Sequence, residues 1–117
     1  LSDRSLVYAA TNNYWETVED HNRALYIDPN NADALAFRAS AYRYLDNLDL
    51  AAKDVNRALS LTPAHVAAIL ERGIIRRLSN NLYGARKDWL HTIKLAPDSP
   101  AAEAARRNLE RLDIKAE

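Results

Sequence analysis

The chain has 117 residues, of which 16 are Lys or Arg and 16 are Asp or Glu, so its formal net charge is zero. A neutral chain lacks the basic excess that a general nucleic-acid-binding protein carries. The absence of cysteine excludes disulfide bonds and thiolate metal sites, and no apolar run approaches the roughly 18 residues of a membrane span.

Apolar residues recur at spacings of three and four along most of the chain, which is the period of one helix face. Asparagine and proline residues interrupt this pattern. Asn tolerates the left-handed conformation that ends a helix, and Pro prevents a helix from continuing. In chain order, the pattern predicts helices over residues 1–11, 14–27, 32–45, 48–61, 65–79, 82–95 and 101–114.

A period of 34 residues runs through these predicted helices. Positions 34 apart share a proline after each helix pair (Pro29, Pro63, Pro97), an asparagine at each turn (Asn13, Asn47, Asn81) and a small residue where two helices would approach closely (Ser5, Ala39, Gly73). A period of this length is the signature of a helical solenoid, in which stacked units bury a continuous core. The first unit is a few residues short, so we expect that the chain is a fragment or a processed form.

The repeated unit resembles the tetratricopeptide repeat (TPR), a helix-turn-helix unit of 34 residues. The central copy carries the resemblance through Leu35, Ala39, Tyr42, Ala51, Val55, Ala58 and Pro63, the third through Ile69, Gly73, Ala85, Trp89 and Pro97, and the first through Tyr8, Ala24 and Pro29. The resemblance implies a right-handed α-solenoid of three antiparallel helix pairs, over residues 1–31, 32–65 and 66–99. Residues 100–117 resemble the family's C-terminal capping helix, which would be the seventh helix.

The capping helix has its own start signal. Ser99 is expected to be its N-cap, with Pro100 at the first helical position and Glu103 in the first turn. Its apolar face would cover the last repeat, whose outer face otherwise has no neighbour. We expect this packing through Ala101, Ala105, Leu109 and Leu112.

Arginine and aspartate form a ladder with the same period. Arg4, Arg38 and Arg72 are each followed 16 residues later by Asp20, Asp54 and Asp88. On antiparallel helices these side chains fall at similar heights, which predicts the ion pairs Arg4–Asp20, Arg38–Asp54 and Arg72–Asp88. The alternative joins each aspartate to the next repeat as Asp20–Arg38, Asp54–Arg72 and Asp88–Arg106. Either ladder is interpreted as structural.

In TPR arrays the first helix of each repeat lines a concave groove, so the resemblance implies a groove surface here. We predict that it contains Phe37, Ser40, Arg43, Tyr44, Leu70, Ile74, Arg77, Leu78, Asn108 and Arg111. The apolar members would hold side chains of a bound peptide, while Arg43, Arg77 and Arg111 would bind its carboxylates. The alternative is that these arginines are solvated or pair with Glu71 and Glu110, and that the apolar residues belong to the core.

Some TPR modules grip chaperone tails with a carboxylate clamp of Lys, Asn and Arg. The corresponding positions here hold Ser2, Leu6, Phe37, Ala67 and Glu71, none of which matches, and Glu71 would repel an acidic tail. A chaperone cofactor of that type is therefore not expected.

No active-site motif is present. His21, His65 and His91 occupy different repeat positions, which does not favour a metal site. His21 is expected to be packed, and His65 and His91 to lie on the surface. We predict no cofactor and no enzymatic activity.

The composition and the repeats favour a protein-interaction scaffold that binds a protein or peptide with apolar anchors and acidic groups, with neither nucleic acid nor a membrane span involved. The alternative is a regulatory or substrate-docking segment of a larger enzyme. Self-association through the uncapped first repeat is a further option.

The charge is unevenly distributed along the chain. Residues 1–65 contain six basic and nine acidic residues, and residues 66–117 contain ten basic and seven acidic residues. This polarity would steer an acidic partner to the C-terminal half or align molecules head to tail, and the alternative is that the charges form a scattered, solvated surface. The compartment stays open, with the cytoplasm slightly favoured.

Overall fold

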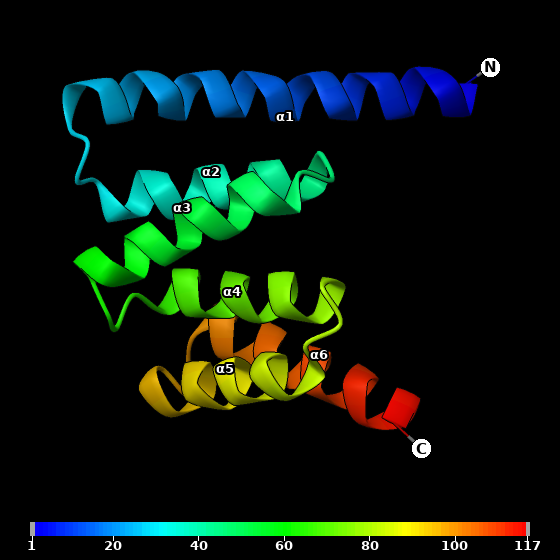
Figure 1. Ribbon diagram of the computed structural model, residues 1–117. Helices are drawn as coiled ribbons and strands as arrows, with labels where there is room; N and C mark the ends of the chain where they lie inside the picture. Colours follow the sequence, from blue (N-terminus) through cyan, green and yellow to red (C-terminus); the bar gives the residue numbers. More distant parts are fainter. Residues whose placement is uncertain (1, 117) are drawn as a thin grey trace.

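The computed structural model describes residues 2–116, with side chains described for residues 13–113. Over this range the chain forms only helices and short connections (Figure 1). The helices are α1 (Ser2–Ile27), α2 (Ala32–Tyr44), α3 (Leu48–Leu61), α4 (Val66–Leu78), α5 (Leu82–Leu95) and α6 (Pro100–Ala116). The prediction of an all-α helical-repeat fold is confirmed. Among the described residues, no helix combines the length and the apolar character that a membrane span requires.

Side-chain caps begin helices α2 to α6. Asn31, Asn47 and Asn81 each accept a hydrogen bond from the backbone N–H three residues later. Ser99 Oγ accepts from Ala102 N at 3.1 Å, as predicted for the start of the last helix. Such a cap satisfies one of the backbone donors that have no partner inside the helix.

The turns inside the second and third repeats depend on a residue with positive φ. Asp46 has φ 61° and Asn80 has φ 66°, and these two residues occupy equivalent positions 34 apart. Asp and Asn adopt this left-handed conformation more readily than other non-glycine residues. Each turn reverses the chain so that α3 packs against α2 and α5 against α4.

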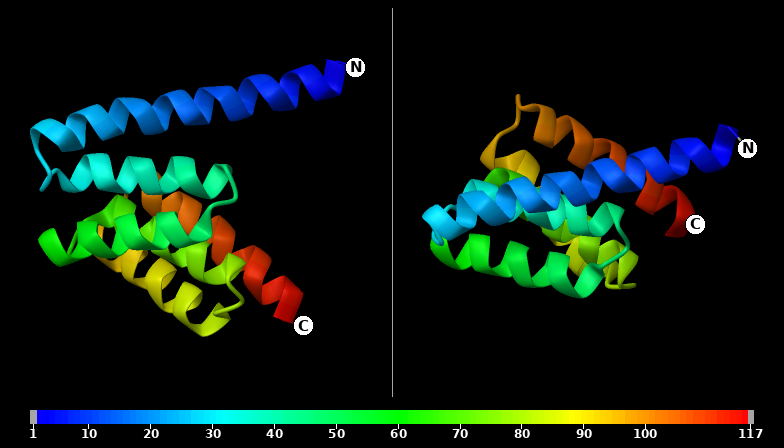
Figure 2. Two further views of the ribbon diagram at one scale, coloured as in Figure 1. Left: turned by 45° about the horizontal axis from the view of Figure 1, so that its top comes forward. Right: turned by 90° about the horizontal axis from the view of Figure 1, so that it is seen from above.

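The helices stack in two layers. Each helix contacts the next, and α2 contacts α4 and α4 contacts α6, whereas α3 and α5 do not contact each other. Helices α2, α4 and α6 therefore line one side of the stack, and α3 and α5 lie on the other (Figures 1 and 2).

Two apolar clusters form the core. The first joins α2, α3 and α4 through small and branched residues, among them Leu35, Ala39, Ala51, Val55, Ala58 and Ile69. The second joins α5 and α6 through Ala85, Trp89, Ala105 and Leu112. Small residues let the helix backbones approach closely, and α6 covers the face that the third repeat would otherwise expose.

The first repeat differs from the prediction. The expected turn at Asn12–Asn13 does not form, and α1 runs without interruption from Ser2 to Ile27. The described chain therefore has six helices rather than seven, and the segment 1–31 is not a helix pair. A turn there would break backbone hydrogen bonds and place a residue in the left-handed region, at about 1–2 kcal/mol.

Candidate functional site

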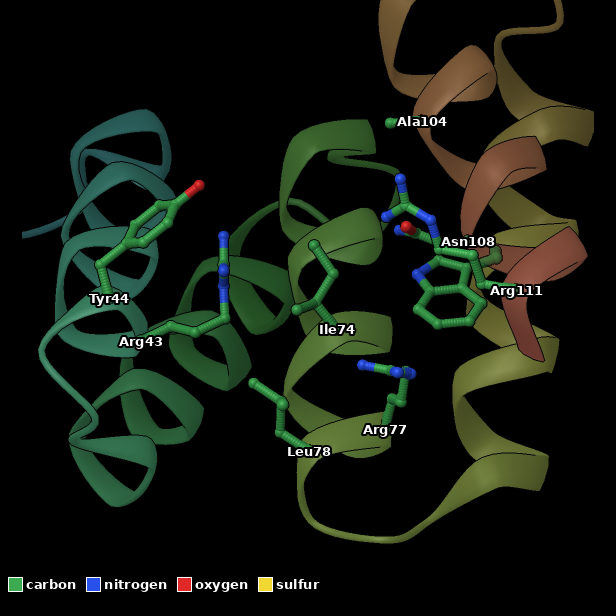
Figure 3. A pocket seen from close by; sticks show the side chains of 9 residues that line it. Arg43, Tyr44, Ile74, Arg77, Leu78, Ala104, Asn108 and Arg111 are labelled. Atoms are coloured by element: carbon green, nitrogen blue, oxygen red, sulfur yellow. The ribbon is translucent and has the colours of Figure 1, made fainter. Parts of the chain in front are cut away.

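The candidate site is a hollow of about 380 Å³ on the side of the stack formed by α2, α4 and α6. Side chains from these three helices surround it in Figure 3. Its lining consists of Arg43, Tyr44, Ile74, Arg77, Leu78, Trp89, Ala104, Asn108 and Arg111. We call this hollow the α2–α4–α6 groove.

The structure brings seven of the ten predicted groove residues together in this groove, from Arg43 on α2 to Arg111 on α6. The other three lie elsewhere. Phe37 and Ser40 line a separate hollow between α1 and α2, and Leu70 packs against the α5–α6 core cluster. The predicted surface is therefore divided between two hollows and the core.

Sequence reasoning missed Trp89 and Ala104 as groove residues. Trp89 is only 1% exposed, yet its buried indole also contributes to the groove lining. It comes from α5, outside the helices that were expected to line the groove. The signal for this contact is Gly73 on α4, where a Cβ atom would lie 2.5 Å from Trp89 Nε1. Without that Cβ, the indole fits directly against the α4 backbone.

Arg43 does not face the groove as a free cation. Its guanidinium makes a two-pronged ion pair with Glu71 of α4, through Nε to Oε2 and through Nη2 to Oε1 at 3.2 Å. Both side chains are largely buried, at 15% and 9% exposure. The expectation that Arg43 binds a ligand carboxylate is therefore wrong for this state, since an internal carboxylate already occupies the guanidinium.

Burial and pairing act on Arg43 in opposite directions. Desolvation by burial lowers the pKa of Arg43, but the hydrogen bonds and charge of Glu71 outweigh it and raise the pKa above its ordinary value. Because the pKa of Arg43 is higher in the folded state than in the unfolded state, the charged guanidinium stabilises the folded protein. This stabilisation is fully present below the unfolded-state pKa and is lost only as the pH rises through the folded-state pKa. Arg43 therefore remains a cation throughout the physiological range.

Aromatic stacking extends this contact toward α1. The guanidinium of Arg43 lies 4.3 Å from the ring centroid of Tyr44, and Tyr44 stacks on Tyr14 of α1 with 4.5 Å between ring centroids. Cation–π and stacking contacts each add a modest attraction beyond area burial. Together with Glu71, these side chains connect α1, α2 and α4 along one edge of the groove.

Arg77 and Arg111 differ from Arg43. Among the side chains that the structure describes, neither one pairs with an acidic group. Asn108 adds an amide to the same wall, and Ile74 and Leu78 provide apolar surface beside it. The groove thus combines two guanidinium groups that retain their hydrogen-bonding capacity with an apolar floor.

The arginine–aspartate ladder forms within repeats. Arg38 donates to Asp54 through Nε and Nη2, both at 2.7 Å, and Arg72 donates to Asp88 at 3.1 and 2.9 Å. Arg76 also donates to Asp88, at 3.0 Å. The alternative register does not form between the described side chains: Arg38 donates to Asn22 rather than Asp20, and Arg106 donates to the carbonyl of Pro97.

The expected Arg4–Asp20 pair is contradicted within one chain. Both residues belong to the continuous helix α1, where 16 residues correspond to about 24 Å along the axis at about 1.5 Å per residue. The side chain of Arg4 lies outside the described residues, and Asp20 pairs instead with Arg23, one turn further along α1.

The histidines serve local structure. The His21 ring packs on Phe37, as expected for a packed position, with 5.7 Å between ring centroids. His65 was expected on the surface, but it is the N-cap of α4: Nδ1 accepts from Ala68 N at 3.1 Å, and Nε2 lies 2.6 Å from Asp33 Oδ1. His91 is exposed. In the described part of the chain, no three His, Asp or Glu side chains are grouped to hold a metal ion.

The fold is similar to solved TPR domains. The first TPR of Spaghetti (RPAP3), bound to the HSP90 peptide SRMEEVD, is 25% identical with a TM-score of 0.78, over 97% of this chain and 88% of that one. The second TPR domain of human RPAP3, in complex with the HSP70 peptide SGPTIEEVD, is 26% identical with a TM-score of 0.73, over 96% and 91%.

A more distant likeness concerns the fold alone. The Yersinia enterocolitica type III secretion chaperone SycD, in complex with a peptide of the translocator YopD, is 12% identical with a TM-score of 0.73, over 100% of this chain and 97% of that one. No protein-family model matches the sequence, and no curated protein matches it. The stacked helix pairs, the 34-residue period and these structural neighbours together show that the chain has the fold of a tetratricopeptide repeat domain.

Proposed function

We propose that this protein is a binding scaffold whose α2–α4–α6 groove takes a peptide segment with an acidic group next to an apolar side chain. The observation that supports this most strongly is the pairing state of the groove arginines. Arg77 and Arg111 line a hollow of about 380 Å³ beside Ile74 and Leu78, and neither has a carboxylate partner among the described side chains. Arginine binds carboxylates in a two-pronged geometry that adds both affinity and orientation.

Each wall of the groove has a role in this proposal. Arg77 on α4 and Arg111 on α6 bind one or two carboxylates, and Asn108 donates to a backbone carbonyl of the peptide. Ile74 and Leu78 receive an apolar side chain beside the buried indole of Trp89. The Arg43–Glu71 pair keeps the α2 wall in place rather than binding the peptide itself.

The structural neighbours support the ligand class. The peptides named with the RPAP3 domains, SRMEEVD and SGPTIEEVD, both carry acidic residues next to an apolar one. The expected clamp positions of this chain still lack Lys, Asn and Arg, so we propose a different set of contacts, nearer the capping helix. The absence of catalytic activity, and the alternative of a docking segment in a larger enzyme, remain predictions.

A peptide-display selection tests this function. A random heptapeptide library is selected on the wild-type protein, and each recovered peptide is titrated by fluorescence anisotropy. We expect an acidic residue next to an apolar one. A charged hydrogen bond contributes about 1.5–3 kcal/mol, so Arg77→Glu/Arg111→Glu is expected to weaken binding by at least about 100-fold.

The matched control reverses two charges on the other side of the stack. Lys53 on α3 and Lys87 on α5 are both exposed, so Lys53→Glu/Lys87→Glu changes the net charge equally without touching the groove. This control is expected to change the affinity less than about threefold. The proposal is wrong if the two double variants lose affinity equally, or if the selected peptides lack acidic residues.

A further inference from the structure

A second hollow, of about 200 Å³, lies between α1 and α2. Its lining comes from both helices and consists of Tyr14, Thr17, His21, Phe37, Ser40, Ala41 and Tyr44. Phe37 and Tyr44, two large apolar or aromatic side chains of this lining, are each 55% exposed. We call this hollow the α1–α2 slot.

The repeat explains what kind of element fits the slot. Adding 34 to each lining position gives Leu48, Ala51, Val55, Glu71, Ile74, Ile75 and Leu78 on α3 and α4. There, helix α2 packs against both α3 and α4. Ala51, Val55 and Ile75 are at most 5% exposed, and Arg43 of α2 binds Glu71. The lining of the α1–α2 slot is thus equivalent to the surface of α3 and α4 against which α2 packs. By this equivalence, the element that fits the slot is a helix.

The helix equivalent to α2 is the N-terminal half of α1. Residues 2–11 correspond to residues 36–45 by the same shift of 34. Because α1 is continuous, this segment cannot fold back over its own slot. Its end instead projects beyond the other helices (Figures 1 and 2).

We propose that two copies of the chain exchange these segments, so that residues 2–11 of each copy fill the α1–α2 slot of the other. The two α1 helices would lie antiparallel and cross near Asn12, in the same relation that α2 has to α3. A two-fold arrangement of this kind fills both slots at once and leaves no open end.

Charge complementarity favours a second copy as the occupant. Arg38–Asp54 and Arg72–Asp88 connect the two helices of the second and third repeats. Their equivalent is Arg4–Asp20, which one continuous helix cannot form. In the exchanged dimer, Arg4 of each copy meets Asp20 of the other, so the ladder is completed twice. Asp20 is available for this role because its contact with Arg23 is local and largely exposed.

Complementary charge reversals test the exchange. Arg4→Asp places two like-charged pairs in the dimer, and so does Asp20→Arg. In the heterodimer of the two variants, the introduced aspartate faces the introduced arginine, and the remaining native Arg4 faces the remaining native Asp20, so both pairs are restored. We expect light scattering to show the wild type and the mixture at twice the mass of one chain, and each variant alone to dissociate at least tenfold more readily. Glu19→Arg, a neighbouring exposed position, serves as the control and is expected to dimerise normally.

The mixture also separates exchange from folding back within one chain. If residues 2–11 fold back over their own slot, mixing the variants restores nothing, and the proposal is wrong. It is equally wrong if the wild type has the mass of one chain at all concentrations. Circular dichroism checks that each variant remains helical.

A cysteine experiment decides the question if either charge variant fails to fold. The chain contains no cysteine, so Arg4→Cys/Asp20→Cys introduces a single pair of thiols. Oxidation is expected to produce a covalent dimer on a denaturing gel. A covalently closed monomer, or the absence of any crosslink, contradicts the exchange.

Discussion

At the scale of single residues, the third repeat differs from the central repeat in where its large side chain lies. It has a smaller residue on one helix and a larger residue on the partner helix. The central repeat packs Ala39 on α2 against Val55 on α3, and the equivalent positions of the third repeat hold Gly73 and Trp89. Gly73 is needed here for close approach, because an added Cβ would lie 2.5 Å from Nε1 and 2.7 Å from Cδ1 of the indole. A rigid, fully buried indole cannot move aside, so the space gained at Gly73 is what admits Trp89.

This compensation predicts a sign change in a double-mutant cycle. Gly73→Ala is expected to destabilise the wild type by about 1–3 kcal/mol through overpacking, although Ala exceeds Gly by about 1 kcal/mol in helix propensity. In a Trp89→Val background, which restores the smaller partner, the same substitution is expected to be neutral or stabilising. Urea unfolding followed by circular dichroism measures both. An equal cost in the two backgrounds would show that the clash is not the cause.

At the scale of elements, the continuity of α1 is the main departure from the repeat pattern. The residues equivalent to Asn12 are Asp46 and Asn80, and both adopt positive φ and end a helix. An identical Asn pair follows α4 at 80–81, so the local sequence permits either outcome at residues 12–13. The apolar surface that a turn would bury determines which outcome is more stable.

Substitution at Asn12 is expected to shift this balance. Asn12→Gly lowers the cost of the turn and disfavours the continuous helix by about 1 kcal/mol relative to Asn12→Ala. The exchanged dimer keeps two α1 helices continuous, whereas a dissociated chain is free to turn at residue 12, so the two variants should differ by up to about 2 kcal/mol, or about 30-fold in the dissociation constant. Light scattering across a concentration series measures the difference. Equal dissociation constants would mean that the helix at residue 12 is not coupled to association.

At the scale of the whole molecule, stability depends on each helix having its apolar face covered by the helices next to it along the chain. Helix α6 contacts α5 and α4 and buries Ala102, Ala105 and Leu112 against the end of the stack. Trp89 is covered on this side, within the cluster that joins α5 and α6. In stacked repeats each unit is stabilised mainly by its nearest neighbours, so the loss of the last helix affects the third repeat first.

Removing α6 by ending the chain at Asp98 is expected to lower the free energy of unfolding by at least about 3 kcal/mol, since burying each large apolar side chain contributes about 1.5–3 kcal/mol. In a Trp15→Phe background, the fluorescence of Trp89 reports the exposed end directly and should shift to longer wavelength. Unchanged emission and unchanged urea midpoint would show that α6 does not act as a cap.

The sequence by itself determined the period and the positions of helices α2 to α6 within two residues, and it left two registers for the partners of Arg38 and Arg72, of which the structure shows the one within repeats. These features depend on local signals, such as N-caps, prolines and apolar spacing, or on a spacing that every repeat shares. Only the tertiary structure decided that α1 is continuous, that Glu71 occupies Arg43, and that Trp89 reaches the groove past Gly73. Each of these outcomes depends on a balance between competing contacts of several helices: a turn against a continuous helix, an internal carboxylate against a ligand, and a large indole against a missing Cβ. A repeat pattern places such residues on a face, but packing between the faces determines which contact forms.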